Sequence, residues 1–306
     1  MKIIVLEGPD GSGKSSLAKA VAQELCDNGI NAVYVHFPDA ESYMGSHIYD
    51  YLKGNQAIPF TDCHFYAQYM MYALDRYEYF IKHREELENK IVICDRYTTS
   101  SMIYQSAGMY MQMKDFVKEG SHLIEQYLSE SGGDYPDELE SNPYKDWLEL
   151  IHSKLWDEFK KFSHAYYNST RYSFNSWYYR FGKYRLPKEC ASLRDFVDHI
   201  ENLEYTMFGI PVPTKIFWIT SDNAQKAMDE QGRDKDAFEG NDDFQEIVRA
   251  AGTIISAQKK WESITNTMGD FDKTKDAIID NIIENVPIPI TYIRAYKRGK
   301  KEETAK

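Results

Sequence analysis

The chain has 306 residues, 42% of them hydrophobic, which is enough to bury one sizeable core, or a core with a substantial insertion. Its formal net charge of -12 argues against a protein that mainly grips nucleic-acid backbones, because such proteins need a strong basic surface. The four cysteines form no CxxC or zinc-type spacing, and no stretch approaches the roughly 18 apolar residues of a membrane-spanning helix. We therefore expect a cytoplasmic protein without stable nucleic-acid or membrane binding.

The chain opens with a predicted strand, a glycine-rich turn and a predicted helix. Residues 2–6 (KIIVL) are apolar and mostly β-branched, whereas apolar residues recur at helical spacing over residues 15–26. Strands that alternate with helices predict an α/β fold, in which a parallel sheet is flanked by helices on both faces. The further predicted strands are residues 32–37, 90–95 and 214–220, and the further predicted core helices are 64–87, 192–208, 244–261 and 273–285.

A long segment of different character interrupts this α/β pattern. It contains two predicted helices, residues 111–129 and 144–167, followed by a stretch crowded with aromatic residues and arginines. Its role stays open: it could line a substrate pocket, cover the face of a homodimer or bind something unrelated. The boundaries that we predict are residues 1–108 and 201–290 for the α/β core, 109–200 for a mainly helical insertion, and 291–306 for a basic, flexible tail.

The turn after the first strand carries a phosphate-binding motif. Residues 8–15 read GPDGSGKS, which satisfies GxxxxGK[ST] in full and stands between a strand and a helix, as this motif requires. Lys14 would neutralise the β- and γ-phosphates, and the Ser15 hydroxyl would ligate Mg²⁺. The motif predicts a nucleoside triphosphate but leaves the reaction open, because GTPases, ATPases and small-molecule kinases share it. The predicted ATP-binding residues are Gly8, Gly11, Ser12, Gly13, Lys14, Ser15 and Ser16.

A second group of candidate residues surrounds the strand predicted at 90–95. Asp95 ends this strand beside the phosphate-binding turn, a position that suits a residue organising Mg²⁺ directly or through water. Arg96 follows it, and Arg76 lies in the preceding predicted helix. A guanidinium group matches the geometry of a phosphate in a way that a lysine cannot. We therefore predict that both arginines clamp the phosphate of an acceptor.

Four separate runs, LEGPDGSGKSS, HFPD, MMYALDR and DRYTTSSMIYQ, together resemble the thymidylate kinase family. The resemblance covers about residues 1–108 and 201–286 and implies a P-loop kinase fold. It also implies that the γ-phosphoryl group of ATP is transferred, with Mg²⁺, to a deoxynucleoside monophosphate, and dTMP is the leading acceptor.

The same resemblance implies roles in the acceptor site. Tyr72 would stack on the base, and Phe37 would close the other side of the pocket. Asp10 would meet the 3′-hydroxyl and help to organise the metal, and Tyr104 would crowd the 2′ position and so favour deoxyribose. The two residues implied at the polar edge of the base are Ser101 and Gln105.

The charged, glycine-containing segment 227–241 is predicted to be a lid over the triphosphate. Members of the resembled family supply a catalytic arginine either from the phosphate-binding loop or from the lid, and the loop position here is Gly11. Arg233 is therefore the predicted cation, with Lys235 second; Asp236, Phe238 and Glu239 match a family run beside it. The catalytic residues that we predict are Lys14, Asp95, Arg96 and Arg233.

Two features depart from the family pattern and leave alternatives open. His36 stands where the family usually has arginine, and the insertion replaces a short connection. One substituent in an apolar pocket is worth only ~1–3 kcal/mol, so a kinase for another or a modified deoxypyrimidine monophosphate stays open. A non-catalytic P-loop regulator is the other alternative, and the acceptor-side residues, Asp10, Arg76, Asp95 and Arg96, argue against it because a nucleotide switch needs no acceptor site.

Overall fold

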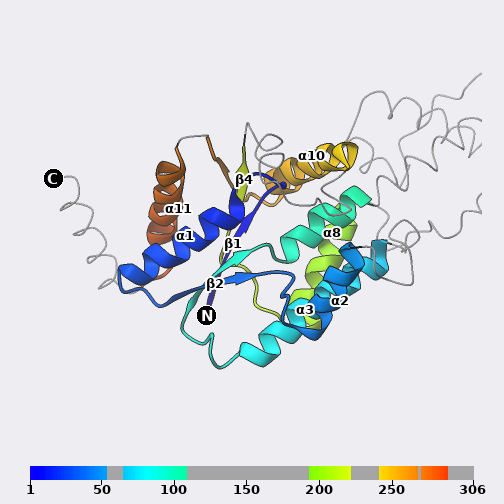
Figure 1. Cartoon of the computed structure of the whole chain (residues 1–306), viewed down its shortest axis with the longest axis horizontal. Coiled ribbons are helices and arrows are strands. Elements are labelled where there is room, and N and C mark those ends of the chain that lie inside the picture. Colours follow the sequence, from blue (N-terminus) through cyan, green and yellow to red (C-terminus); the bar gives the residue numbers. More distant parts are fainter. Residues whose placement is uncertain (54–64, 109–192, 222–240, 268–269, 289–306) are drawn as a thin grey trace, which may run out of the picture.

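The computed structural model describes residues 1–53, 65–108, 193–221, 241–267 and 270–288, which fold into an α/β layered structure (Figure 1). The helices predicted at 111–129 and 144–167, the predicted lid apart from its last residue and the predicted tail lie outside these described residues. None of the described helices is long and apolar enough to cross a membrane.

The core of the structure is a sheet of five strands, all parallel, in the order β2-β3-β1-β4-β5. The predicted parallel sheet is therefore confirmed. Because parallel strands need crossover connections, helices lie between them in the sequence and cover both faces of the sheet. The strands are β1 (Lys2–Glu7), β2 (Ala32–His36), β3 (Ile91–Asp95), β4 (Lys215–Thr220) and β5 (Glu262–Thr265).

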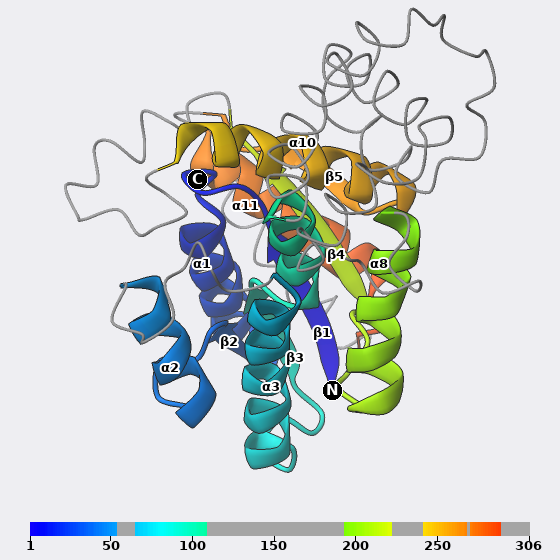
Figure 2. The same cartoon turned by 90° about the vertical axis from the view of Figure 1, so that its right-hand side faces the viewer.

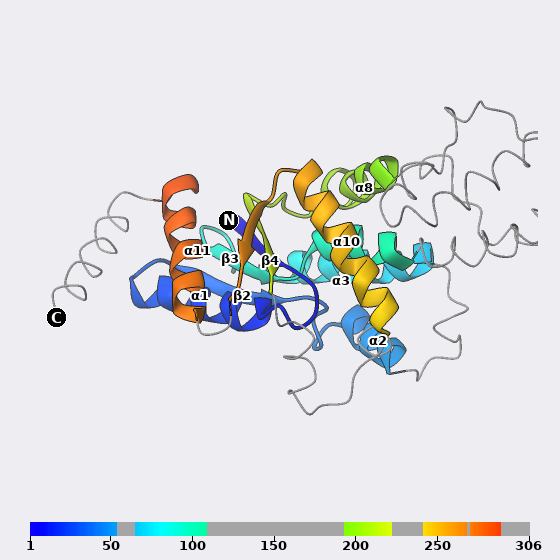
Figure 3. The same ribbon diagram turned by 90° about the horizontal axis from the view of Figure 1, so that it is seen from above.

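The helices divide between the two faces, with the strands between them when the molecule is seen from above (Figure 3). They are α1 (Lys14–Asp27), α2 (Tyr43–Leu52), α3 (Phe65–His83), α8 (Leu193–Glu201), the π-helix η4 (Asn202–Met207), α10 (Asp242–Gln258) and α11 (Phe271–Asn285). Residues 98–108 are also helical. Figure 2 shows α3 and α8 side by side, with α10 across their upper ends.

Successive side chains of β1 point to opposite faces of the sheet and belong to two separate hydrophobic cores. Ile4 and Leu6 point to one face and pack with side chains of α1 and α11. Ile3 and Val5 point to the other face, where Phe80 of α3 packs with them. Since successive residues of a strand point to opposite faces, a central strand buried on both sides needs an unbroken apolar run, which is what KIIVL provides.

Some elements differ from those predicted. The helix predicted at 192–208 is α8 followed by η4, so its second half has a wider turn than an α-helix. α2 and β5 were not predicted. β5 has only four residues with alternating partial exposure, a weak signal that is typical of a sheet edge. α8 begins before the predicted end of the insertion at residue 200, and Tyr69 Oη of α3 donates to Ile200 O (3.4 Å), so this helix packs on α3.

The contact between α10 and β4 gives a prediction for stability. A methyl group added at Gly252 would overlap the indole ring of Trp218, which is buried. Gly252→Ala should therefore lower the free energy of unfolding by about 1–3 kcal/mol, although alanine favours a helix more than glycine does. Chemical denaturation checks this, with the neighbouring exposed Thr253→Ala as the control. A stabilised Gly252→Ala protein would contradict the packing described here.

Candidate active site

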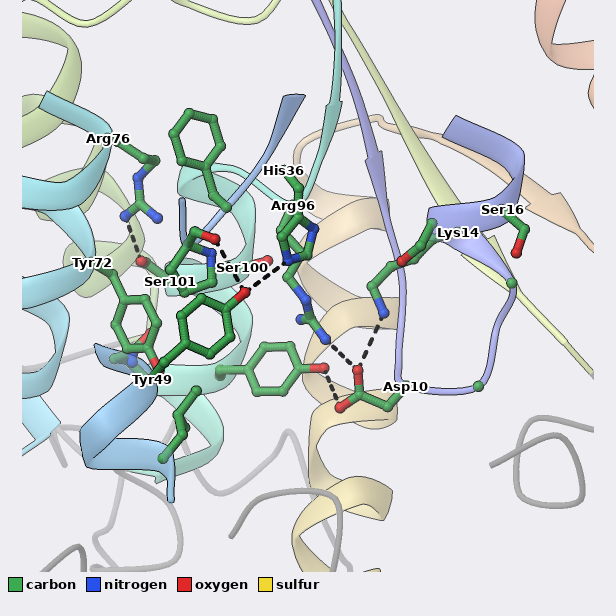
Figure 4. A pocket seen from close by; sticks show the side chains of 18 residues that line it. Asp10, Lys14, Ser16, His36, Tyr49, Tyr72, Arg76, Arg96, Ser100 and Ser101 are labelled. Atoms are coloured by element: carbon green, nitrogen blue, oxygen red, sulfur yellow. Dashed lines mark hydrogen bonds and ion pairs between the residues drawn. The ribbon is translucent and has the colours of Figure 1, made fainter. Parts of the chain in front are cut away.

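Strands β1, β2 and β3 end at the same edge of the sheet, and a pocket of about 410 Å³ opens there (Figure 4). The predicted residues that line it are Asp10, Gly11, Gly13, Lys14, Ser15, Ser16, Phe37, Tyr72, Arg76, Arg96, Ser101, Tyr104 and Gln105. Three other predicted residues do not line it and are buried: Gly8, Ser12 and Asp95. Arg233 lies outside the described residues. The structure thus brings residues of all four motif runs to one cavity.

The phosphate-binding turn has the backbone that its glycines permit. Gly13 has a φ of 82°, a value that costs glycine nothing and other residues energy, and α1 begins at the next residue. The Asn266 side chain, which follows β5, donates from Nδ2 to Ser12 O (2.9 Å) and holds the turn from the other side. Lys14 Nζ contacts Pro9 O (3.3 Å), so it points back over its own loop.

Asp10 is the meeting point of four donors. Its Oδ1 accepts from Lys14 Nζ (3.2 Å) and from Arg96 Nη2, and its Oδ2 accepts from Tyr104 Oη (3.0 Å) and Gln245 Nε2 (3.1 Å). Burial raises the pKa of Asp10, but the charges of Arg96 and Lys14 outweigh it and hold the pKa well below its usual range. The carboxylate therefore stays ionised and fixes both cations at the pocket wall, as Figure 4 shows.

Arg96 takes an uncommon backbone conformation to reach Asp10. Its φ is 67°, a left-handed value that costs a residue with a side chain of order 1–3 kcal/mol and that structures keep mainly at functional sites. The guanidinium lies over the Tyr104 ring, with Cζ 4.9 Å from the ring centroid. Behind it, Glu7 accepts from Thr99 Oγ1 (2.8 Å) and Ser100 Oγ (2.5 Å), which ties the end of β1 to helical residues 98–108.

Asp95 has one engaged and one orphaned carboxylate oxygen. Oδ2 accepts from Tyr34 Oη (3.0 Å) and contacts His36 Nδ1 (2.8 Å), whereas buried Oδ1 has no hydrogen-bond partner of good geometry among the described residues. Burial raises the pKa of Asp95, but His36, Lys14 and the Ser15 hydroxyl lower it well below its usual range. An orphaned carboxylate oxygen near a hydroxyl is a donor set that fits Mg²⁺.

Arg76 lines the pocket, but its charge is paired. Nε and Nη2 donate to the two carboxylate oxygens of Glu204, each at 2.6 Å, and Nη2 also donates to Ser101 Oγ (2.7 Å). The side chain of Arg76 is 2% exposed and that of Glu204 is fully buried. Arg76 was predicted to clamp a phosphate. This ion pair favours a contact with an uncharged group of the acceptor instead.

Aromatic side chains form much of the remaining wall. Tyr72 and Tyr49 both line the pocket, and Tyr49 Oη bonds Pro38 O (3.2 Å) and lies 3.3 Å from His36 Nε2. Phe37 touches the pocket but also packs at 5.2 Å between ring centroids on Tyr79, within the core. Tyr49 had not been singled out from the sequence, and neither had Glu204 or Gln245. No local pattern marks these three residues, because the partners of Glu204 and Gln245 are distant in sequence and Tyr49 lies in α2, which was not predicted.

Comparison with known proteins shows one consistent relationship. The family model for thymidylate kinase matches residues 6–121. Thymidylate kinase from Plasmodium falciparum is 26% identical over 179 residues, 54% of this chain and 79% of that protein. A probable thymidylate kinase from Methanococcus maripaludis (strain S2) is 36% identical over 104 residues, 34% of this chain. The chain spans 46% of that archaeal relative's length and 59% of the length of a thymidylate kinase from Brachyspira hyodysenteriae.

The fold also has a counterpart among solved structures. The structure of thymidylate kinase from Candida albicans superposes with a TM-score of 0.54 and covers 93% of this chain and 92% of its own. Only 16% of the aligned residues are identical, so this likeness shows a shared fold.

The connection between α2 and α3 gives a prediction for pH dependence. Asp75 accepts from Ser42 Oγ (2.6 Å) and Asp39 N (3.2 Å), and burial raises its pKa to about 6. Because this exceeds the usual value near 4, the folded state binds the proton more tightly, so the contribution of Asp75 to stability is present below about pH 4 and is lost as the pH rises through 6.

Asp75→Asn removes this titration. Relative to wild type, its free energy of unfolding should therefore rise by roughly 2–3 kcal/mol between pH 4 and pH 7.5. Urea denaturation at the two pH values measures the difference, and Asp50→Asn, at an exposed position of α2, is the control. A difference between Asp75→Asn and wild type that does not change with pH would contradict the prediction.

Proposed function

We propose that the chain is a member of the thymidylate kinase family and that it transfers the γ-phosphoryl group of ATP to dTMP, which gives dTDP and ADP. The observation that carries the proposal is that one pocket has the phosphate-binding turn and two cations at one end and aromatic, electrically neutral walls at the other. A nucleoside monophosphate has the same division between a charged and an uncharged end.

The cationic end of the pocket suits both phosphate groups. Lys14 and Arg96 share the single carboxylate of Asp10, so phosphate oxygens can compete with it for both cations. When ATP binds, Lys14 would leave Asp10 for the β- and γ-phosphates, and Arg96 would hold the acceptor phosphate in line with them. Positioning and electrostatic stabilisation provide most of the catalysis in phosphoryl transfer, and these residues supply both.

Ser15 and Asp95 would hold Mg²⁺ at this end. An ion held there would supply positive charge that stabilises the phosphates during the transfer. No group of three or more His, Cys, Asp or Glu side chains that could hold a metal occurs among the described residues. Mg²⁺ is often held by only one or two protein ligands, and Ser15 and Asp95 would supply them.

The neutral end of the pocket suits a pyrimidine that carries a carbonyl group. Arg76 can only donate hydrogen bonds, and the amide of Gln105, which lines the same region, can both donate and accept. Thymine offers a carbonyl acceptor beside an N–H donor, whereas cytosine offers an amino donor where thymine has the carbonyl. Tyr72 would stack on the ring, and Tyr104 would lie against the sugar.

Arg233 completes the proposal as the catalytic cation, although it lies outside the described residues. Gly11 occupies the only alternative position in the phosphate-binding turn and carries no charge. An arginine in this role typically contributes ~10³–10⁵ to the rate. A cytoplasmic location stays a prediction from the sequence, and so does a homodimer.

The direct test of the function is a screen for ADP release from ATP with each nucleoside monophosphate, with and without Mg²⁺. We expect turnover with dTMP, weaker turnover with dCMP and none without the metal. Thymidine in place of dTMP should give no turnover, because the cationic end would then have no acceptor phosphate to hold. A chain that hydrolyses or binds ATP but phosphorylates none of the monophosphates would refute the proposal.

Arg96 gives a sharper test of the two ends. Arg96→Met should lower kcat/KM for dTMP by roughly 10²-fold or more, since it removes a positioned charge from the acceptor phosphate. The Kd for ATP, measured by calorimetry, should change by only a few-fold. The control is Arg84→Met, an exposed residue beyond the end of α3. An equal loss of ATP and dTMP affinity would place Arg96 on the wrong side of the pocket.

A further inference from the structure

We propose that Glu204, on the π-helix η4, is a positioning residue that balances the charge of Arg76, fixes its guanidinium group as a directed hydrogen-bond donor and so determines which base the acceptor pocket takes. This inference rests on the proposed function and names a residue that lies beside the pocket rather than in its lining.

The geometry of the pair leaves Arg76 little freedom. Glu204 receives Nε and Nη2 in a two-point contact, with both distances at 2.6 Å, and Thr98 Oγ1 donates to Glu204 Oε2 (2.8 Å). The second Nη2 hydrogen goes to Ser101 Oγ, and Nη1 reaches Tyr97 O at 3.4 Å. Helix α3, helical residues 98–108 and η4 therefore meet at one guanidinium group.

A count of donors shows what remains for a ligand. A guanidinium group has five N–H donors. Glu204 takes two, Ser101 takes one and Tyr97 takes one, so among the described residues a single N–H of Nη1 is left. Because the carboxylate cancels the charge of the arginine, that N–H suits a neutral carbonyl oxygen better than a phosphate. Without Glu204, the same arginine would attract anions to the neutral end of the pocket.

Stability alone is a weak reason for this pair. A buried ion pair gives up the hydration of two charges and is often no more stabilising than well-packed apolar side chains. Its two-point geometry instead fixes the plane of the guanidinium group, which is what a hydrogen bond to the edge of a flat base requires. η4 also has the wider turn that proteins frequently place beside functional sites.

The test is a comparison of steady-state kinetics for wild type and Glu204→Gln. Glutamine keeps the size of the side chain but can accept through only one oxygen. The charge of Arg76 is then no longer balanced, and Arg76 loses one of its two hydrogen bonds to residue 204. We expect the KM for dTMP to rise at least 10-fold and the ratio of kcat/KM for dTMP over dCMP to fall at least 10-fold. The KM for ATP should stay within about twofold, with a normal circular dichroism spectrum.

Two other variants separate positioning from general packing. Thr98→Val removes the hydroxyl that orients Glu204 and should change the same two quantities in the same direction, by a smaller factor. Lys259→Met is the control, because Lys259 ties α10 to α8 through Asp198 (2.9 Å) and Glu201 (3.0 Å) without touching the pair. It should leave both quantities at their wild-type values.

The outcomes are distinct. A folded Glu204→Gln protein with the wild-type KM for dTMP and the wild-type base preference overturns the inference and leaves the proposed function standing. An equal rise in the KM for dTMP and the KM for ATP has the same consequence. If Glu204→Gln does not fold, Thr98→Val decides, and wild-type kinetics for that variant overturn the inference. If wild type phosphorylates no monophosphate, the proposed function fails first and the inference falls with it.

Discussion

The ion pair between Asp10 and Arg96 is the interaction on which the pocket depends. It joins the loop after β1 to the loop after β3, and Lys14, Tyr104 and Gln245 all bond the same carboxylate. The left-handed backbone of Arg96 is the local cost of that contact, and two charges with several partners offset it. Because Asp10 accepts four hydrogen bonds, two at each oxygen, a ligand group that bonds this carboxylate would replace one of these partners. The side chains around Asp10 are therefore already held in place before a ligand binds.

A second buried ion pair, Arg76 with Glu204, has the opposite electrostatic effect. At Asp10 two cations share one carboxylate, so phosphate oxygens can replace it as the partner of either cation. At Glu204 a single cation, Arg76, pairs with a single anion, so the pair has no net charge and can offer a ligand only directed hydrogen bonds. One pocket thus has a charged end and a neutral end built from acidic and basic residues. The two ends differ in the number of cations that bond each carboxylate, two at Asp10 and one at Glu204. This difference fixes the direction in which an asymmetric acceptor can enter.

Features that depend on a short run of sequence could be predicted. The GPDGSGKS run between strand and helix, the apolar KIIVL strand and the DR pair after β3 each carry their signal within about ten residues. What was missed depends on partners brought together by folding. Gln245 lies 235 positions from Asp10 and Glu204 lies 128 positions from Arg76, so no spacing rule could link them. The sequence could identify Arg76 as a pocket residue. It could not show that the charge of Arg76 is paired, because the partner is the distant Glu204.

The same long-range pair explains how the core tolerates the segment between residues 108 and 193. Helical residues 98–108 lead into that segment and carry Ser101, whereas α8 and η4 follow it and carry Glu204. Arg76 bonds both side chains at once, so the chain on either side of the segment is fastened to α3 rather than to its own sequence neighbours. The two junctions are therefore held in place by the same side chain. A site whose walls are fastened in this way could keep its geometry with an insertion between them, as the sequence predicts.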